Sequence, residues 1–273
     1  MRILHATDFS PTAELARTLA VDVALRAAAE LHVVHVQPHF LEGHGRAYLP
    51  AGAEALNADL RRRLKEEREA ETRGLTDQLA VLTDGGATTE MVWGDPRREL
   101  LRLAPDCDLL VMGAHGRTPF DDVFLGGVAG YVVRRTTTPV LTVRENCPTR
   151  QVRRLLVATD FGEAALAAFT FANWLAERAS LKLVLAHVEE GPPGEAGSSQ
   201  ARLETLSAGR AERIVVIGGN PIDTLPQLAA ELGADAIVVG MRRHGALAGL
   251  IMGARGDALV RSSAIPILSV PAT

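Results

Sequence analysis

The sequence predicts an α/β fold of two tandem doubly wound domains, and an internal repeat is the first observation behind this prediction. The segment Ala6–Phe9 (ATDF) recurs as Ala158–Phe161. Further matched segments follow in the same order: Trp93–Pro96 with Gly218–Pro221, Asp108–Gly113 with Asp235–Gly240, and Thr138–Val143 with Ile265–Val270. Self-similarity along the whole chain indicates two copies of one unit. We expect the domains at residues 1–146 and 152–273, divided by the polar stretch Arg144–Gln151.

Short apolar runs rich in valine and leucine are the second observation. Continuous apolar runs, rather than alternating ones, are typical of strands buried on both faces of a parallel sheet. The expected strands of the first unit are Ile3–Thr7, Leu31–Val36, Glu90–Gly94, Asp108–Gly113 and Pro139–Val143.

Helical patterns between the apolar runs are the third observation. Thr12–Ala29 places leucine and valine at helical spacing, and a further helix is expected to begin near Gly126–Val128. Asp95-Pro96 and Asn220-Pro221 each set a capping residue before a proline that can open a helix. Alternating strands and helices predict a doubly wound α/β domain with right-handed crossovers.

The two copies differ after their second strand. The first has room for a long charged helix over Glu54–Leu82, whose charges we interpret as a solvated face rather than a partner site. In the second copy a linker-like stretch, Glu189–Gln200, takes that place, and we expect only a short helix near Gln200–Leu206.

Composition excludes several classes of protein. A net charge of −4 and 4% aromatic residues argue against a nucleic-acid-binding protein. Two cysteines in a chain of this size indicate a reducing cytoplasm rather than a disulfide scaffold. The first ten residues do not resemble a secretion signal, and no apolar stretch approaches the length of a membrane span, so we expect no membrane partner. His35, His39 and His44 match no standard zinc spacing, so no metal site is expected.

Asp8 and Asp160 follow the first strand of each copy, and Gly113 and Gly240 end the fourth. If strands one and four are neighbours, these residues meet at the carboxyl edge of the sheet, where open α/β sheets bind ligands. The helix that begins near Gly126–Val128 would direct free amide groups at the same place and favour an anion there. A turn that needs glycine only for backbone reasons is the alternative.

The order of these landmarks resembles the universal stress protein family. The segments ATDFS, HV, GDP, DLLVMGAHGR, LGGVAGYVVRR and TPVLTVR follow the family's sequence over nearly the whole chain, as two tandem domains. The resemblance implies a five-stranded parallel sheet in each domain, with the two domains related by a pseudo-two-fold axis. One subclass of the family binds ATP through the motif G-x2-G-x9-G-[ST].

The resemblance also implies site residues for ATP, bound with or without Mg²⁺. Thr7 and Asp8 would contact the adenosine end, and the backbone of Val36 would read adenine. The ribose and phosphates would be held by the remaining motif residues, which are Met112, Gly113, His115, Gly116, Arg117, Gly126, Gly127 and Val128. Gly127 departs from the motif, because the family has a serine or threonine there, and the lost hydroxyl would weaken binding. Asp121 and Asp122 would either recruit Mg²⁺ or face water.

The second copy departs further from the motif. Its candidate residues are Thr159, Asp160, Val188, Gly240, Arg242, Arg243, Gly253 and Ala254. Arg243 stands where the second glycine is expected, and Ala254 replaces the hydroxyl residue. Arg243 would either block the pocket, or join Arg242 and His244 in binding phosphates by charge. Whether the second domain binds nucleotide stays open.

Three functions compete on these residues. The first is an ATP-binding or adenine-nucleotide-binding protein that acts in stress response or signalling, through nucleotide-linked conformation or assembly with an unknown protein partner. The second is a regulatory or interaction module of the same fold without nucleotide. A weak ATPase ranks last, because no water-activating base is expected beside the phosphates.

Assembly can be predicted from the last strand of each unit, which would lie at a sheet edge. Exposed edges tend to be paired or covered. We expect Pro139–Val143 to pair with its counterpart near Ile265–Val270 inside one chain, and a homodimer of such chains would be a further step of assembly.

Overall fold

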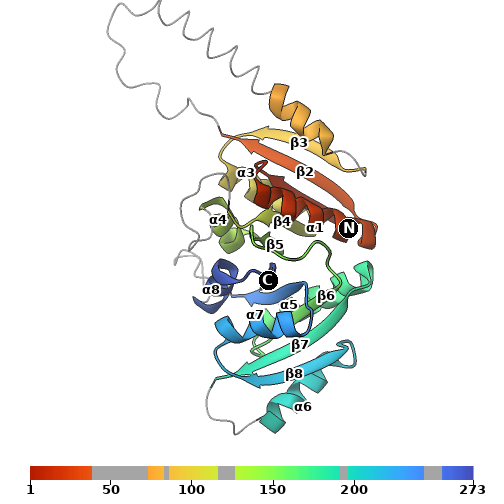
Figure 1. The fold of residues 1–273 in the computed structure, drawn as a ribbon, viewed down its shortest axis with the longest axis vertical. Coiled ribbons are helices and arrows are strands. Elements are labelled where there is room, and N and C mark those ends of the chain that lie inside the picture. Colours follow the sequence, from red (N-terminus) through yellow and green to blue (C-terminus); the bar gives the residue numbers. More distant parts are fainter. Residues whose placement is uncertain (39–72, 83–85, 116–126, 191–195, 243–253, 273) are drawn as a thin grey trace, which may run out of the picture.

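The computed structural model describes residues 1–38, 73–82, 86–115, 127–190, 196–242 and 254–272. Ten strands form one sheet in the order β3-β2-β1-β4-β5-β10-β9-β6-β7-β8, so each half of the chain contributes five neighbouring strands (Figure 1). Within each half all strand pairs are parallel, which confirms the predicted doubly wound α/β fold.

The first half places its helices between the strands in chain order. Its strands are β1 (Arg2–Thr7), β2 (Glu30–Gln37), β3 (Thr88–Trp93), β4 (Leu109–Gly113) and β5 (Val140–Val143). Its helices are α1 (Pro11–Ala27), α3 (Pro96–Leu103), the 3-10 turn η1 (Ala104–Asp106) and α4 (Gly127–Arg135). The side chain of Asp95 accepts a hydrogen bond from the amide of Arg97 (2.8 Å), so the predicted cap of α3 is confirmed.

The second half repeats this plan. Its strands are β6 (Arg154–Ala158), β7 (Lys182–Glu189), β8 (Arg213–Gly218), β9 (Ala236–Met241) and β10 (Ile267–Pro271). Its helices are α5 (Glu163–Ala179), α6 (Ala196–Ser207), α7 (Pro221–Glu231) and α8 (Ala254–Ser262). Asn220 caps α7 through a bond from the amide of Ile222 (3.0 Å), as predicted.

The two halves join through their last strands. β5 and β10 pair antiparallel, with Leu141 opposite Leu268, while β4 and β9 flank the joint on either side. This intrachain pairing confirms the sequence prediction. The strand order of the second half mirrors that of the first across the joint, which is the arrangement expected of pseudo-two-fold symmetry.

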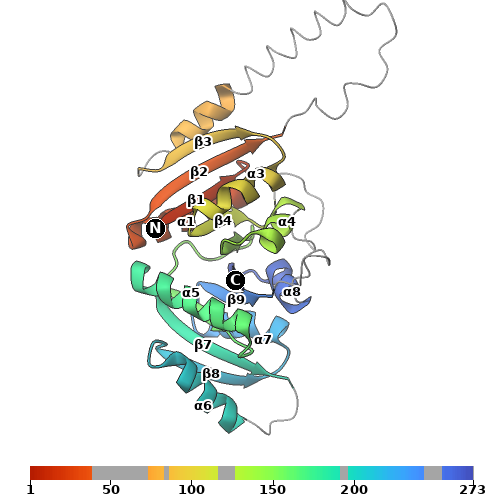
Figure 2. The same cartoon turned by 180° about the vertical axis from the view of Figure 1, so that it is seen from behind.

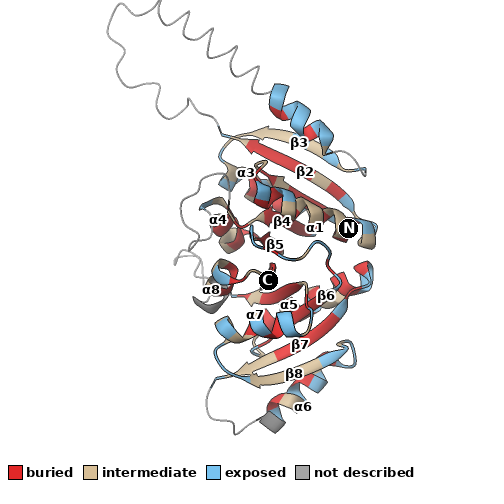
Figure 3. Cartoon of the chain, in the orientation of Figure 1, coloured by how far each residue is buried: buried red, intermediate tan, exposed pale blue. Residues whose placement is uncertain are grey.

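Two apolar layers cover the sheet (Figures 1 and 2). On one face, Leu19 of α1, Phe169 of α5 and Leu203 of α6 are buried in one continuous cluster. On the other face, Val132 of α4 and Leu259 of α8 belong to a second cluster. Figure 3 shows the central strands buried between these layers, as continuous apolar runs require, while β3 and β8 at the two ends of the sheet are only partly buried.

Two sequence predictions change in detail. Residues 73–81 are helical, while most of the expected helix Glu54–Leu82 lies outside the described residues. α6 is longer than predicted, because it already begins at Ala196 inside the stretch interpreted as a linker. Its Leu203 is buried under the sheet, and such burial stabilises a helix that composition alone does not favour. No helix in the described part of the chain is long and apolar enough to cross a bilayer.

Candidate functional site

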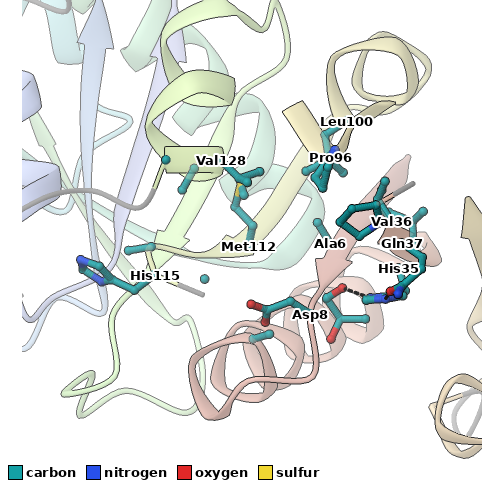
Figure 4. A pocket seen from close by; sticks show the side chains of 18 residues that line it. Ala6, Asp8, His35, Val36, Gln37, Pro96, Leu100, Met112, His115 and Val128 are labelled. Carbon is teal, nitrogen blue, oxygen red and sulfur yellow. Dashed lines mark hydrogen bonds between the residues drawn. The ribbon is translucent and has the colours of Figure 1, made fainter. Parts of the chain in front are cut away.

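A cavity opens at the carboxyl edge of the first half of the sheet. β1 pairs with both β2 and β4, so the strand order reverses there and the edge forms a switch point. The cavity measures about 400 Å³, which suits a ligand of drug size. Its walls come from β1, β2, β4 and the starts of α1, α3 and α4 (Figure 4).

Every candidate residue of the first domain that the structure describes lines this cavity. These residues are Thr7, Asp8, Val36, Met112, Gly113, His115, Gly127 and Val128. Gly116, Arg117 and Gly126 lie outside the described residues, as do Asp121 and Asp122. In Figure 4 the His115 ring points away from Met112 and Asp8.

Sequence reasoning missed the apolar wall opposite Asp8. It is formed by Pro96 and Leu100 of α3, with Gln37 at the end of β2 and Pro38 directly after it. The Gly94-Asp95-Pro96 segment was interpreted only as a helix start, but its proline also lines the cavity. A flat apolar wall beside polar strand ends is the usual composition of a small-molecule site.

Asp8 is held by the turn between β1 and α1. Its carboxylate oxygen Oδ1 accepts a hydrogen bond from the amide of Ser10 (3.0 Å), and Thr7 Oγ1 accepts one from the amide of Phe9 (3.0 Å). Phe9 itself has a φ of 61°, which is uncommon for a residue with a side chain. The turn therefore fixes the Asp8 carboxylate at the cavity rather than leaving it to solvent.

The backbone of Val36 faces the open side of β2. The carbonyl of Gln37 accepts a bond from the amide of Gly94 and so points toward β3. The N–H and C=O of one strand residue point to the same side, and this side alternates from residue to residue, so the polar groups of Val36 point toward β1. β1 is already finished there, because its pairing with β2 ends at Thr7 opposite His35. An amide and a carbonyl in this position can recognise the polar edge of a flat ring.

His35 connects three walls of the site. Its Nδ1 donates to the carbonyl of Thr7 (2.8 Å), its Nε2 lies 3.0 Å from Gln37 Oε1, and its ring packs against Phe9 at 4.7 Å between centroids. His35 is only 5% exposed. These contacts give the ring a structural role, which holds Gln37 at the cavity mouth.

Gly113 packs closely on the start of α1 as well as lining the cavity. A Cβ at Gly113 would lie 3.1 Å from Thr12 Cγ2 and 3.3 Å from the amide nitrogen of Ala13. An added side chain would need α1 to shift slightly, and both interpretations of this glycine stay predictions. Gly127 differs, because it stands at the N-terminus of α4 and its neighbour in space is a guanidinium nitrogen of Arg97.

The second half keeps the turn but fills the space beside it. Asp160 Oδ1 accepts from the amide of Gly162 (2.8 Å), and Thr159 Oγ1 accepts from the amide of Phe161 (2.9 Å), as in the first half. Here, however, Nη2 of Arg242 lies 2.6 Å from Asp160 Oδ2. A Cβ on Gly162 would lie 2.8 Å from the same nitrogen, so this glycine leaves room for the arginine.

The remaining second-half candidates are only partly described. Val188 lies one residue before the end of β7, opposite Ile217 of β8. Gly240 packs directly on α5, where an added Cβ would lie 2.1 Å from the carbonyl oxygen of Ala164. Ala254 is the first residue of α8. Arg243 and Gly253 lie outside the described residues, so the choice between blocking and phosphate binding by Arg243 stays open.

Taken together, the fold and the cavity define a tandem α/β protein with a ligand site at the switch point of its first sheet. The model of the universal stress protein family matches residues 1–144 and again residues 151–271. The chain belongs to the universal stress protein family.

Individual relatives agree with this membership. A universal stress protein of Methanocaldococcus jannaschii is 30% identical over 155 residues, which cover 52% of this chain and 94% of that protein. A universal stress protein of Mycobacterium tuberculosis is 27% identical over 289 residues, covering 97% of this chain and 95% of that protein. The crystal structure of a universal stress protein from Archaeoglobus fulgidus matches 100% of this chain and 98% of that one, with a TM-score of 0.73 at 20% identity.

Proposed function

We propose that the protein binds one adenine nucleotide, ATP with or without Mg²⁺, in the cavity of its first domain. In this proposal the bound nucleotide stabilises one conformation or assembly state of a cytoplasmic stress-response or signalling protein. The single observation that carries the proposal is the cavity of about 400 Å³ between the Asp8 turn and the N-terminus of α4.

Each wall of the cavity offers chemistry that a nucleotide needs. The apolar side around Val36, Leu100 and Met112 suits a base, and the polar groups of Val36 suit the edge of that base. A carboxylate such as that of Asp8 accepts hydrogen bonds from ribose hydroxyls. The first amides of α4 have no helical acceptor, so they favour phosphate at Gly127.

The same residues argue for binding rather than turnover. Among the described residues no group of three or more histidine, cysteine or carboxylate side chains is placed to hold a metal ion. Mg²⁺ would therefore be held mainly by the phosphates themselves. We expect phosphate release by the protein to stay at the level of an Asp8→Ala variant, and release well above that control would revive the ATPase reading.

The test measures bound nucleotide directly. The purified protein is denatured, and released nucleotide is quantified by chromatography and mass spectrometry, followed by titration of the emptied protein with ATP. We expect about one nucleotide per chain, and a loss of roughly 10-fold or more in ATP affinity for Asp8→Ala, because a charged hydrogen-bond acceptor is removed. Asp160→Ala in the second domain is the matched control and should change neither value.

A second function fits the second domain. Its Asp160 carboxylate already pairs with Arg242, which favours the reading of this half as a regulatory or interaction module without nucleotide. About two nucleotides per chain would contradict that reading. No released nucleotide, together with no thermal shift on adding ATP and Mg²⁺, would extend the interaction-module reading to the whole chain.

A further inference from the structure

The guanidinium of Arg97 lies beside Gly127, the first residue of α4. Arg97 belongs to α3, which packs against α4. If Gly127 carried a Cβ, that atom would lie 3.1 Å from Arg97 Nη2. Gly127 lines the cavity, whereas Arg97 is an exposed residue next to that lining. A side chain at position 127 would therefore crowd the guanidinium.

A cation in this position is electrostatically unusual. The N-terminus of a helix carries partial positive charge, which favours anions and disfavours a neighbouring cation. Within the part of the chain that the structure describes, no carboxylate forms an ion pair with Arg97. The ring of Tyr131, one turn further along α4, lies near, with the guanidinium carbon 5.7 Å from its centroid. An anion between Arg97 and the α4 amides would relieve the unfavourable charge.

The second half shows the opposite combination at the corresponding positions. Ile222 follows the helix-opening proline of α7 where Arg97 follows Pro96, and Ala254 opens α8 where Gly127 opens α4. Arg97 and Gly127 thus occur together in the first half, and the second half has neither an arginine nor a glycine at the corresponding positions.

We propose that Arg97 is a phosphate ligand of the first-domain site, which binds the phosphate tail together with the N-terminal amides of α4. This inference rests on the proposed nucleotide function and adds a specificity: the site prefers adenosine di- and triphosphates to adenosine. A planar guanidinium binds phosphate oxygens through two parallel hydrogen bonds, and such charged bonds are roughly twice as strong as neutral ones.

The test compares ATP with adenosine in binding titrations of the full chain. Arg97→Met keeps most of the side-chain bulk and removes the charge, and we expect it to weaken ATP binding about 10- to 100-fold. Adenosine affinity should stay within about 2-fold, because adenosine has no phosphate. Arg98→Met, the same change at the next position of α3, is the matched control and should leave both affinities unchanged.

Gly127→Ala tests the link between the two positions. Its Cβ would displace the guanidinium, so we expect a several-fold loss of ATP affinity in the wild-type background and none in the Arg97→Met background. A double-mutant cycle then gives a clear coupling between the two changes. Thermal unfolding without ligand checks that each variant is folded.

The binding results distinguish a failure of the Arg97 assignment from a failure of the nucleotide function. Equal ATP affinities of the Arg97→Met and Arg98→Met variants would overturn the assignment of Arg97 and leave the proposed nucleotide function standing. Equal losses for ATP and adenosine would show that Arg97 only shapes the cavity, which also overturns it. A wild-type protein that binds neither ligand would refute the nucleotide function itself.

Discussion

The two halves of the chain build the same turn after the first strand and use it differently. In the first half the Asp8 turn borders a cavity, and Ser10 caps the following helix α1. In the second half Asp160 pairs with Arg242, and the capping position holds Gly162, which has no side chain to cap α5. The two halves thus share the hydrogen bonds of the turn, while Arg242 pairs with the turn carboxylate in the second half.

The largest expected loss of stability comes from changes at the joint between the halves, where β5 pairs with β10. Leu141 is 3% exposed and lies between Val111 of β4 and Leu268 of β10. Leu141→Pro removes a buried leucine and a strand amide, so we expect a loss of about 3 kcal/mol or more in the free energy of unfolding. Urea unfolding measures the loss, and Leu141→Ala separates lost burial from lost pairing. Equal losses in the two variants would show that the amide contributes nothing.

Gly113 and Gly240 are equivalent positions of the two halves, and we expect alanine to destabilise the protein by different amounts at each. A Cβ at Gly240 would lie 2.1 Å from the backbone oxygen of Ala164, whereas at Gly113 the nearest atoms are 3.1 Å away. Gly240→Ala forces α5 to move, and we expect it to cost about 3 kcal/mol, against about 1 kcal/mol for Gly113→Ala. Thermal unfolding of both variants checks the order. A Gly113→Ala variant that is the less stable of the two would contradict this account.

A buried histidine gives the first half a dependence on pH that has no counterpart at the equivalent position of the second half. His5 is fully buried in β1, where its Nδ1 donates to the carbonyl of Val111 (3.1 Å), and burial lowers its pKa from 6.5 to about 4. Its Nε2 has no partner in the described part of the chain. The equivalent residue of the second half is Val157, which does not titrate.

Between pH 6.5 and about 4 the unfolded chain binds a proton at His5 that the folded chain does not. The free energy of unfolding therefore falls as the pH falls through this range, by up to about 3 kcal/mol from this residue, and His5 contributes no such change above pH 6.5. Urea unfolding of the wild type and of His5→Val across the range isolates the contribution, because all other groups are shared. Parallel pH profiles would refute it.

The smallest expected effect concerns the helix caps. Ser10 Oγ accepts from the amide of Ala13 (3.2 Å), so Ser10→Ala should cost about 1 kcal/mol. The reverse change, Gly162→Ser, should gain less than this, because its Cβ would meet Arg242 and Asp160 within 3 Å. Thermal unfolding of both variants tests the asymmetry, and a full gain from Gly162→Ser would mean that Arg242 moves away at no cost.

Features that depend on local sequence were predicted well. The strands follow from their apolar runs, the caps at Asp95 and Asn220 from the proline that follows each, and the meeting of Asp8 with Gly113 from the order of a doubly wound sheet. These features need only short-range geometry or a general rule of topology.

Features that depend on distances between helices were missed. Nothing in the sequence places Arg97 of α3 at Gly127 of α4, or Leu100 on the cavity wall, because both depend on how the two helices pack. Arg242 was considered as a phosphate ligand, and its pairing with Asp160 was missed although the expected strand order already brings the ends of β9 and β6 together. The nucleotide roles of the cavity residues stay predictions.

The antiparallel joint of β5 and β10 has a consequence for how the protein behaves on dilution. Because both strands belong to one chain, their pairing is an intramolecular event with a high effective concentration. The connecting segment raises it further, since Cys147 and Val152 are buried and the amide of Val152 donates to Asp22 of α1 (2.7 Å). The joint thus stays closed whether the cell holds few copies of the protein or many.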